Sequence, residues 1–141
     1  MFLLSNDRSD CVQFVGDLIL SKSVENKVVL WRPIIESEGD EPVYSKQPPS
    51  GMEYLWKFEL EHCNHWFVRF HTAPPKYDIL ALGNSKGKVY LWHLRGANMS
   101  RKPFRTLDTE TESSVRMVLF NPHGGQLVAV KDDSTVWLWD S

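Results

Sequence analysis

The protein has 141 residues, of which 42% are hydrophobic and 24% charged, and its formal net charge is −2. This composition is typical of one soluble globular domain, and no run approaches the roughly 18 apolar residues that a membrane helix needs. The near balance of charges excludes a chain that attracts nucleic acid through its overall charge. Cys11 and Cys63 are too few for a disulfide framework and indicate a reducing compartment, and Met1–Leu4 is too short for the apolar core of a secretion signal.

Six tryptophans are the unusual feature of the composition, and three of them close an internal repeat. The repeated segments are 11–33, 66–94 and 114–141. Each segment predicts an apolar strand, a turn, a second apolar strand, a polar turn and a third strand that ends on Leu-Trp, at Trp31, Trp92 and Trp139. The spacing from Trp92 to Trp139 is close to the period of about 40–45 residues that propeller blades show.

The closing strands of the repeat are apolar on both faces. They comprise Val28–Trp31, Val89–Trp92 and Val136–Trp139. Continuous runs of β-branched and aromatic residues are typical of strands that lie between neighbouring sheets. Two further strands are predicted, at Met52–Leu60, which alternates apolar with charged residues, and at Pro103–Leu107. Because no stretch has a convincing 3.6-residue apolar period, the sequence predicts an all-β chain.

Residues 34–51 lengthen the spacing from Trp31 to Trp92. The segment is rich in acidic residues and proline and poor in residues that form a core. It therefore predicts an exposed insertion between the third and fourth strands of a blade. Two interpretations stay open: a loop that binds a partner, and a surface insertion that the fold tolerates.

The repeat resembles those of WD-repeat propellers. Trp139–Asp140 is the dipeptide after which the class is named, and Phe120–Pro122 is its usual turn into the second strand. Asp133 occupies the polar turn position that the class favours. The other two repeats depart from the pattern at the dipeptide and at this turn position.

The strand count corresponds to slightly under three blades, with sequence repeats at about 11–33, 52–94 and 103–141. A propeller closes with about four to eight blades, and each blade buries its apolar faces against both neighbours. The fold class that we predict is all-β, a partial WD-repeat β-propeller of about three blades that is not closed. We expect the chain to be the C-terminal part of a larger propeller, with apolar faces exposed at both ends of the arc.

A closer resemblance covers nearly the whole chain, from Cys11 to Asp140. Its most specific piece is Gly16–Ser23, GDLILSKS, which generic WD repeats do not share. Further matching residues are Glu25–Asn26, Trp66, Arg69–Phe70, Leu80–Asn84, Gly87–Lys88 and Asp132–Asp133. In these residues the chain is similar to the C-terminal blades of the extra sex combs family, whereas the segments 34–51 and 95–102 do not match that family in detail.

The resemblance implies a non-catalytic subunit of Polycomb repressive complex 2, located in the nucleus and folded as a ring of seven blades. It implies two partners: a histone methyltransferase subunit of the Enhancer-of-zeste type, and trimethyl-lysine on histone tails, bound in an aromatic cage. Through both partners the subunit would support histone methylation and gene repression. We further expect no cofactor, no direct sequence-specific binding of nucleic acid and no membrane. The alternative is a generic WD-repeat adaptor for other protein–protein interactions.

Trp66 and Phe67 stand where the family's cage contributes a Trp and a neighbouring Tyr. A quaternary ammonium donates no hydrogen bond, so ring faces hold it by cation–π attraction, about 0.5–2 kcal/mol for each well-placed ring. Adjacent residues of a regular strand point to opposite faces, so both rings can line one cage only at an irregular entry to a strand. Phe in place of Tyr keeps the ring, so binding should weaken modestly. Arg69 matches a family position near the same pocket.

Alternatives stay open at each of these positions. Trp66 and Phe67 can instead pack between blades, and Arg69 can cap a carboxylate rather than order the loop or contact a peptide. The family's other cage aromatics come from earlier blades. We therefore predict no measurable methyl-lysine binding by this chain alone.

The remaining polar clusters predict neither a metal site nor catalysis. His62, Cys63 and His65 include potential zinc ligands, but a structural zinc site needs four ligands and no second pair completes one. Asp132–Asp133 lies in a predicted turn, where a structural role is the better interpretation than acid–base chemistry. The sequence has no nucleophile elbow, P-loop or Gly-rich dinucleotide turn. We expect no catalytic residue, no metal and no cofactor.

Overall fold

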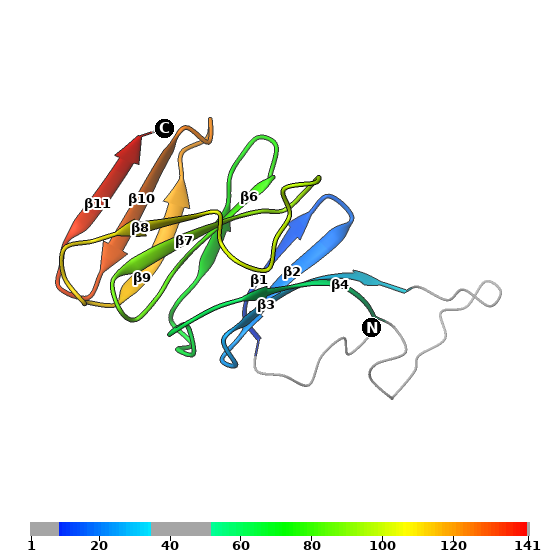
Figure 1. The fold of residues 1–141 in the computed structure, drawn as a ribbon, viewed down its shortest axis with the longest axis horizontal. Coiled ribbons are helices and arrows are strands. Elements are labelled where there is room, and N and C mark those ends of the chain that lie inside the picture. The colour runs from blue at the N-terminus through cyan, green and yellow to red at the C-terminus, as the bar shows by residue number, and fades with distance from the viewer. Residues whose placement is uncertain (1–8, 35–51, 141) are drawn as a thin grey trace.

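The computed structural model describes residues 9–34 and 52–140, and within these ranges the chain forms eleven β-strands and no helix. The strands make three antiparallel sheets that lie side by side (Figure 1). The prediction of an all-β, open partial propeller is confirmed. The described ranges accordingly contain no helix that could cross a membrane.

The first sheet has four strands in the order β1-β2-β3-β4. They are β1 (Ser9–Val15), β2 (Leu18–Ser23), β3 (Lys27–Pro33) and β4 (Met52–Glu59). The segment 34–51 therefore connects the third strand of this sheet to the fourth. Apart from the exposed Ile34, its residues lie outside the described ranges, and an exposed insertion there stays a prediction.

The middle sheet has four strands and the last sheet has three. The middle sheet comprises β5 (Phe70–Thr72), β6 (Ile79–Gly83), β7 (Lys88–His93) and β8 (Arg105–Asp108). The last sheet comprises β9 (Val115–Phe120), β10 (Gln126–Lys131) and β11 (Val136–Asp140). Since β4 pairs with β3 and β8 with β7, each fourth strand closes the sheet before it. The sequence repeats that start near 52 and 103 thus begin one strand earlier than the sheets that follow.

Two closing tryptophans are buried and hydrogen-bonded. The indole Nε1 of Trp31 donates to the hydroxyl of Ser21 (3.1 Å), and that of Trp92 donates to the carbonyl of Arg101 (3.2 Å). Buried indole N–H groups need such acceptors. The repeated Leu-Trp therefore places, near the end of each of these strands, a large apolar ring whose one polar atom is satisfied.

The core is divided between two junctions of neighbouring sheets. The first junction, between the first and middle sheets, buries Leu20, Val28, Phe58, Leu80, Leu82 and Trp92, among others. The second junction, between the middle and last sheets, buries Ala81, Val89, Leu107, Val115, Val118 and Leu127, among others. Side chains alternate along a strand, so β6 contributes Leu80 and Leu82 to one junction and Ala81 to the other. The middle sheet is buried on both faces.

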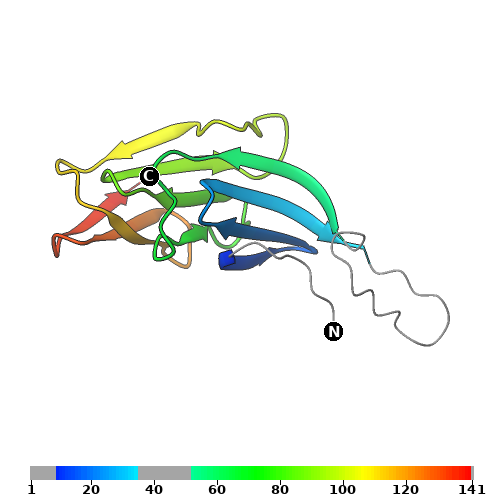
Figure 2. The ribbon, with the colours of Figure 1, turned by 90° about the horizontal axis from the view of Figure 1, so that it is seen from below.

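The two ends of the row of sheets expose apolar side chains. On β1, Cys11 and Gln13 form hydrogen bonds toward the middle sheet, so the alternating Phe14, which is 70% exposed, points away from it. On β11, Val136 is 67% exposed and Leu138 is exposed as well. Figure 2 shows the strands of all three sheets running roughly along one direction, as neighbouring blades do. Both end faces are suited to contact a further sheet.

Candidate functional site

Trp66 and Phe67 lie in a turn between β4 and β5. The amide of Val68 donates to the carbonyl of His65 (3.2 Å), which makes Trp66 and Phe67 the two central residues of this turn. The turn removes the alternation of a regular strand and allows the two neighbouring rings to meet. This turn is the irregular entry to a strand that Trp66 and Phe67 need if both rings are to line one site.

The two rings meet at nearly a right angle. Their centroids are 5.8 Å apart and their planes are inclined by 80°. Trp66 is 67% exposed, whereas Phe67 is partly buried against the core of the first junction. The imidazole of His65 stacks on Phe67 with a centroid distance of 5.0 Å and an angle of 6°. Packing between blades thus describes Phe67 but not Trp66, and the pair forms a corner with one exposed and one supported wall.

Arg116 of β9 lies over the ring of Phe67. Its guanidinium carbon is 3.9 Å from the ring centroid, within the range of a cation–π contact. The same guanidinium forms an ion pair with Asp132, which connects the turn to the last sheet. Arg116 therefore joins the candidate site residues that the sequence predicts.

The backbone of Arg69 lies next to that of Arg116. Its amide faces the Arg116 carbonyl at 3.4 Å, and it forms an isolated parallel bridge with Met117. Within residues 9–34 and 52–140 the exposed guanidinium of Arg69 forms no ion pair, so a carboxylate for it to cap is absent there. Arg69 and Arg116 precede their closing tryptophans by the same number of residues. This repeat symmetry is the sequence signal that points to Arg116.

The loop before the turn is anchored to both neighbouring sheets through its backbone. The amide of Cys63 donates to Asn26 Oδ1 (2.7 Å), which comes from the turn between β2 and β3. The carbonyl of Glu61 accepts from Asn84 Nδ2 (3.3 Å), directly after β6. Asn26 adopts the left-handed backbone conformation (φ 56°), which asparagine tolerates better than most residues. Two asparagine side chains thus fix the approach to the aromatic pair.

Cys63 is a buried thiol. Its Sγ lies within hydrogen-bond distance of the carbonyls of Glu61 (3.3 Å) and Gly83 (3.4 Å). Burial raises the pKa of Cys63 to about 12, so the thiol stays protonated near neutral pH. The part of the chain that the structure describes contains no group of three side chains able to hold a metal ion.

Asp133 has the structural role that the turn chemistry predicts. Its Oδ1 accepts hydrogen bonds from the amide and the hydroxyl of Thr135 (3.1 and 2.6 Å), and its Oδ2 accepts one from the hydroxyl of Thr111 (2.7 Å). These bonds, those of Thr135 first, hold the pKa of the carboxyl well below its usual range. A carboxylate held in this way is a poor general base.

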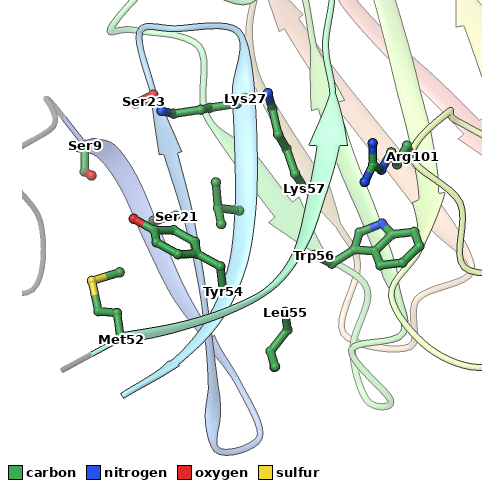
Figure 3. A pocket seen from close by; sticks show the side chains of 11 residues that line it. Ser9, Ser21, Ser23, Lys27, Met52, Tyr54, Leu55, Trp56, Lys57 and Arg101 are labelled. Atoms are coloured by element: carbon green, nitrogen blue, oxygen red, sulfur yellow. The ribbon is translucent and has the colours of Figure 1, made fainter. Parts of the chain in front are cut away.

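A cavity of about 390 Å³ lies on the first sheet, on the side turned away from the middle sheet (Figure 3). Its lining includes Ser21 and Val29, whose sequence neighbours point into the first junction. Figure 3 shows the Trp56 ring beside Arg101 at its rim. The same face of the sheet exposes Phe14, so a neighbouring blade of a closed ring would cover it. The cavity is part of an unpaired end face and is separate from the aromatic corner.

Comparisons with known proteins connect this geometry to one family. No protein-family model matches the chain. The chain is 39% identical over 132 residues to the Polycomb protein esc of Drosophila melanogaster, covering 93% of this chain and 30% of that protein. It is 31% identical over 132 residues to the Polycomb group protein FIE1 of Oryza sativa subsp. japonica, covering 93% of this chain and 32% of that protein.

A solved structure shows the same fold. The chain superposes on a chain of ctPRC2, the Polycomb repressive complex 2 of Chaetomium thermophilum, in complex with H3K27me3 and H3K27M. The TM-score is 0.73 at 20% identity, covering 96% of this chain and 51% of that chain. The chain spans about a third of the length of the curated relatives that it matches.

Proposed function

Because the chain belongs to the extra sex combs family of Polycomb proteins, we propose that it forms the C-terminal blades of the WD-repeat subunit of a Polycomb repressive complex 2. The subunit acts in the nucleus without catalysis. It is a scaffold that supports a methyltransferase subunit of the Enhancer-of-zeste type, histone methylation and gene repression. The proposal is supported by relatives named as Polycomb proteins and by the fold of a chain in a Polycomb complex.

Within this subunit, we propose that Trp66 and Phe67 form part of a site for trimethyl-lysine of a histone tail. The observation that carries the proposal is the exposed Trp66 ring, held at 80° to Phe67 by a turn with fixed anchors. Trp66 presents an exposed π face to a cation, next to the supporting ring of Phe67. Since a trimethylammonium group donates no hydrogen bond, such faces are what it can bind.

Two contacts hold Phe67 in place beside Trp66. The guanidinium of Arg116 lies 3.9 Å from the centroid of the Phe67 ring and the imidazole of His65 stacks on it at 5.0 Å, so Phe67 acts as the fixed support of the exposed Trp66 ring. Asp132 keeps the guanidinium in place. Arg69, exposed beside the turn, is the residue that we assign to the approach of the peptide.

Two rings enclose a cation on two sides only. A complete cage needs further aromatic side chains, and the relatives that this chain matches are about three times its length. A chain of the similar structure belongs to a complex with H3K27me3. We therefore expect that the chain alone gives no measurable methyl-lysine binding and that the complete propeller does.

The test uses a complete propeller in which this chain replaces the matching segment of Drosophila melanogaster esc. Binding of a trimethyl-lysine peptide and of its unmethylated form is measured by calorimetry. The chimera should bind the trimethylated peptide more tightly. Trp66→Ala should weaken that binding on the order of tenfold, which corresponds to about 1.4 kcal/mol and lies within the range for one well-placed ring.

The matched control is Tyr77→Ala, which removes another exposed aromatic ring, from the loop between β5 and β6 and away from the end faces. This change should leave both affinities as they are. Equal binding of the two peptides by the folded chimera, or equal effects of Trp66→Ala and Tyr77→Ala, would contradict the reader function.

A further inference from the structure

Lys22 of β2, in the GDLILSKS segment, is a fully buried lysine at the first junction. Its Nζ lies 3.1 Å from Asp10 Oδ2, 3.2 Å from the carbonyl oxygen of His65 and 3.4 Å from that of Ser23. An ammonium has three N–H donors, and these three oxygens account for all of them. The side chain of Asp10 is only 8% exposed, so the two residues form a buried ion pair.

One of these three bonds reaches the aromatic turn. Asp10 and Ser23 belong to β1 and β2, whereas His65 precedes Trp66 in the loop between β4 and β5. The carbonyl of His65 also accepts the hydrogen bond of the Val68 amide that closes the turn. The carbonyl that defines the turn is therefore fixed to the first sheet by a charge-assisted hydrogen bond.

We propose that Lys22, held in place by Asp10, is a positioning residue for the Trp66–Phe67 corner. Its bond to His65 sets the orientation in which the two rings meet. An effect of Lys22 on methyl-lysine binding rests on the proposed function. An effect of Lys22 on the geometry of the turn does not, because it depends only on the contacts of Lys22.

The chemistry of the position favours this role over a contribution to stability alone. Burying an ammonium and a carboxylate carries a desolvation penalty that an apolar side chain of similar volume avoids. The neighbouring Leu20 shows that β2 presents apolar residues to the same junction. A buried ion pair is weak evidence for stability, whereas its directional bonds fix one geometry.

The last sheet offers a matched control. Lys131 of β10 is also buried, and its Nζ donates to the carbonyl (2.8 Å) and hydroxyl (2.5 Å) of Thr111, with Asp133 at 3.5 Å. It thus binds the loop between β8 and β9 by the same chemistry. Substituting Lys131 removes a buried ammonium without touching the turn at His65.

The experiment measures amide hydrogen exchange of the 141-residue chain by NMR. Lys22→Met keeps the apolar stem and removes the three donors. Exchange of the Val68 amide should become about tenfold faster, as expected for a lost hydrogen bond to a charged group. Lys131→Met should leave Val68 unchanged and speed exchange in residues 109–114 instead. An unchanged Val68 in Lys22→Met, or an equal change in both variants, overturns the proposal.

Asp10→Asn is the second variant, used where Lys22→Met does not fold. It keeps the side-chain shape and removes the counter-charge, so exchange at Val68 should rise while β6 and β7 stay protected. An equal rise of amide exchange at Val68 and throughout the first and middle sheets overturns the proposal.

In the complete propeller, Lys22→Met should also weaken trimethyl-lysine binding several-fold, with Trp66→Ala as the reference. Without an effect of Trp66→Ala the proposed function fails, and exchange at Val68 still decides the role of Lys22.

Discussion

Two loops have the same place in the fold and are held in opposite ways. Residues 60–69 connect β4 to β5, and residues 109–114 connect β8 to β9, so each joins a fourth strand to the first strand of the next sheet. Each loop also receives a hydrogen bond from a buried lysine, Lys22 for the earlier loop and Lys131 for the later. The two loops thus share a bond to a buried lysine and differ in their other anchors.

The later loop is held by its own side chains in addition to its backbone. The hydroxyl of Thr109 donates to the carbonyl of Gly87 (2.6 Å), that of Thr111 donates to Asp133, and the hydroxyl of Ser113 accepts from the Asp133 amide (2.9 Å). These side chains are committed to the fold. The exposed side chains that the 109–114 loop offers besides them include Glu110 and Glu112, and the loop has no aromatic ring.

The earlier loop is held by its backbone, through side chains that other elements supply. Asn26, Asn84 and Lys22 bind main-chain atoms of residues 61–65. The side chain of Trp66 consequently remains exposed while its backbone is fixed. This difference between the loops indicates how equivalent loops of a repeat can differ in binding. A loop anchored by its main chain leaves its side chains free to contact a partner.

Asn84→Ala should cause the largest loss of stability among these predictions. It should also loosen the 60–69 loop more than the 109–114 loop. Asn84 is buried, and its Oδ1 accepts from the amides of Lys86 and Lys88 (2.9 Å each) while its Nδ2 binds Glu61. Loss of these partners should lower the free energy of unfolding by about 3 kcal/mol in urea titrations. Hydrogen exchange should rise in residues 60–69.

The backbone of Asn84 supplies the control for this prediction. Its carbonyl accepts from the Val115 amide (2.9 Å), and an alanine keeps that bond. The turn that Asn84 holds also carries Gly87, whose carbonyl anchors Thr109, so exchange in residues 109–114 should rise in Asn84→Ala, but less than in residues 60–69. An equal rise of exchange in both loops would show that the two are not anchored independently.

Gly83→Ala should act on the other junction, with a cost of about 2 kcal/mol from overpacking. A Cβ on Gly83 would lie 2.2 Å from Val115 Cγ1 and 2.4 Å from its Cβ, so β6 and β9 would have to move apart. Urea titration gives the cost, and exchange should rise in residues 109–114 more than in 60–69. In a Val115→Gly background the cost of Gly83→Ala should shrink; the same cost in both backgrounds would rule out this contact as its cause.

Arg116→Gln should sharpen the comparison, because Arg116 connects the earlier loop to the last sheet. It removes the cation over Phe67 and the ion pair with Asp132, and the expected loss is about 1 kcal/mol. A double-mutant cycle with Phe67→Leu isolates the ring contact and should give a coupling of about 0.5–1 kcal/mol. Zero coupling would mean that the guanidinium does not stabilise the turn.

The architecture was accessible from the sequence because strand alternation and the closing tryptophans are local patterns. Val89–Trp92 is apolar on both faces, and the structure buries the middle sheet on both sides. The conflict between strand alternation and two adjacent cage aromatics also indicates that Trp66 and Phe67 must leave the regular strand, as they do.

The residues that hold the Trp66–Phe67 turn could not be predicted from local sequence patterns. Lys22 and His65 are 43 residues apart in the sequence, and in LILSKS a lysine resembles the polar end of a strand. Its burial follows from the loop that packs over it, which no local pattern encodes. Arg116 reaches Phe67 across a junction between two sheets, so only the symmetry of the repeat points to it.

The smallest expected effect is a pH dependence at the second junction. His71 of β5 accepts a hydrogen bond at Nδ1 from the amide of Phe120 (3.2 Å), which requires a neutral ring nitrogen, and burial lowers the pKa of His71 from its ordinary 6.5. The unfolded chain therefore takes up this proton at a higher pH than the folded chain does. The contribution of His71 to stability should be complete above about pH 6.5 and should decline as the pH falls below it.

Thermal unfolding between pH 8 and pH 5 measures this decline. His71→Gln keeps an acceptor for the Phe120 amide but does not titrate, so its Tm should depend less on pH than that of the parent chain. His62→Gln is the control, since His62 is exposed and should leave the parent dependence in place. If His71→Gln retains the full dependence, protonation of the junction between β5 and β9 is not its source. The loss on acidification should also appear as faster exchange in β9 before β2, because only the second junction depends on a neutral histidine nitrogen.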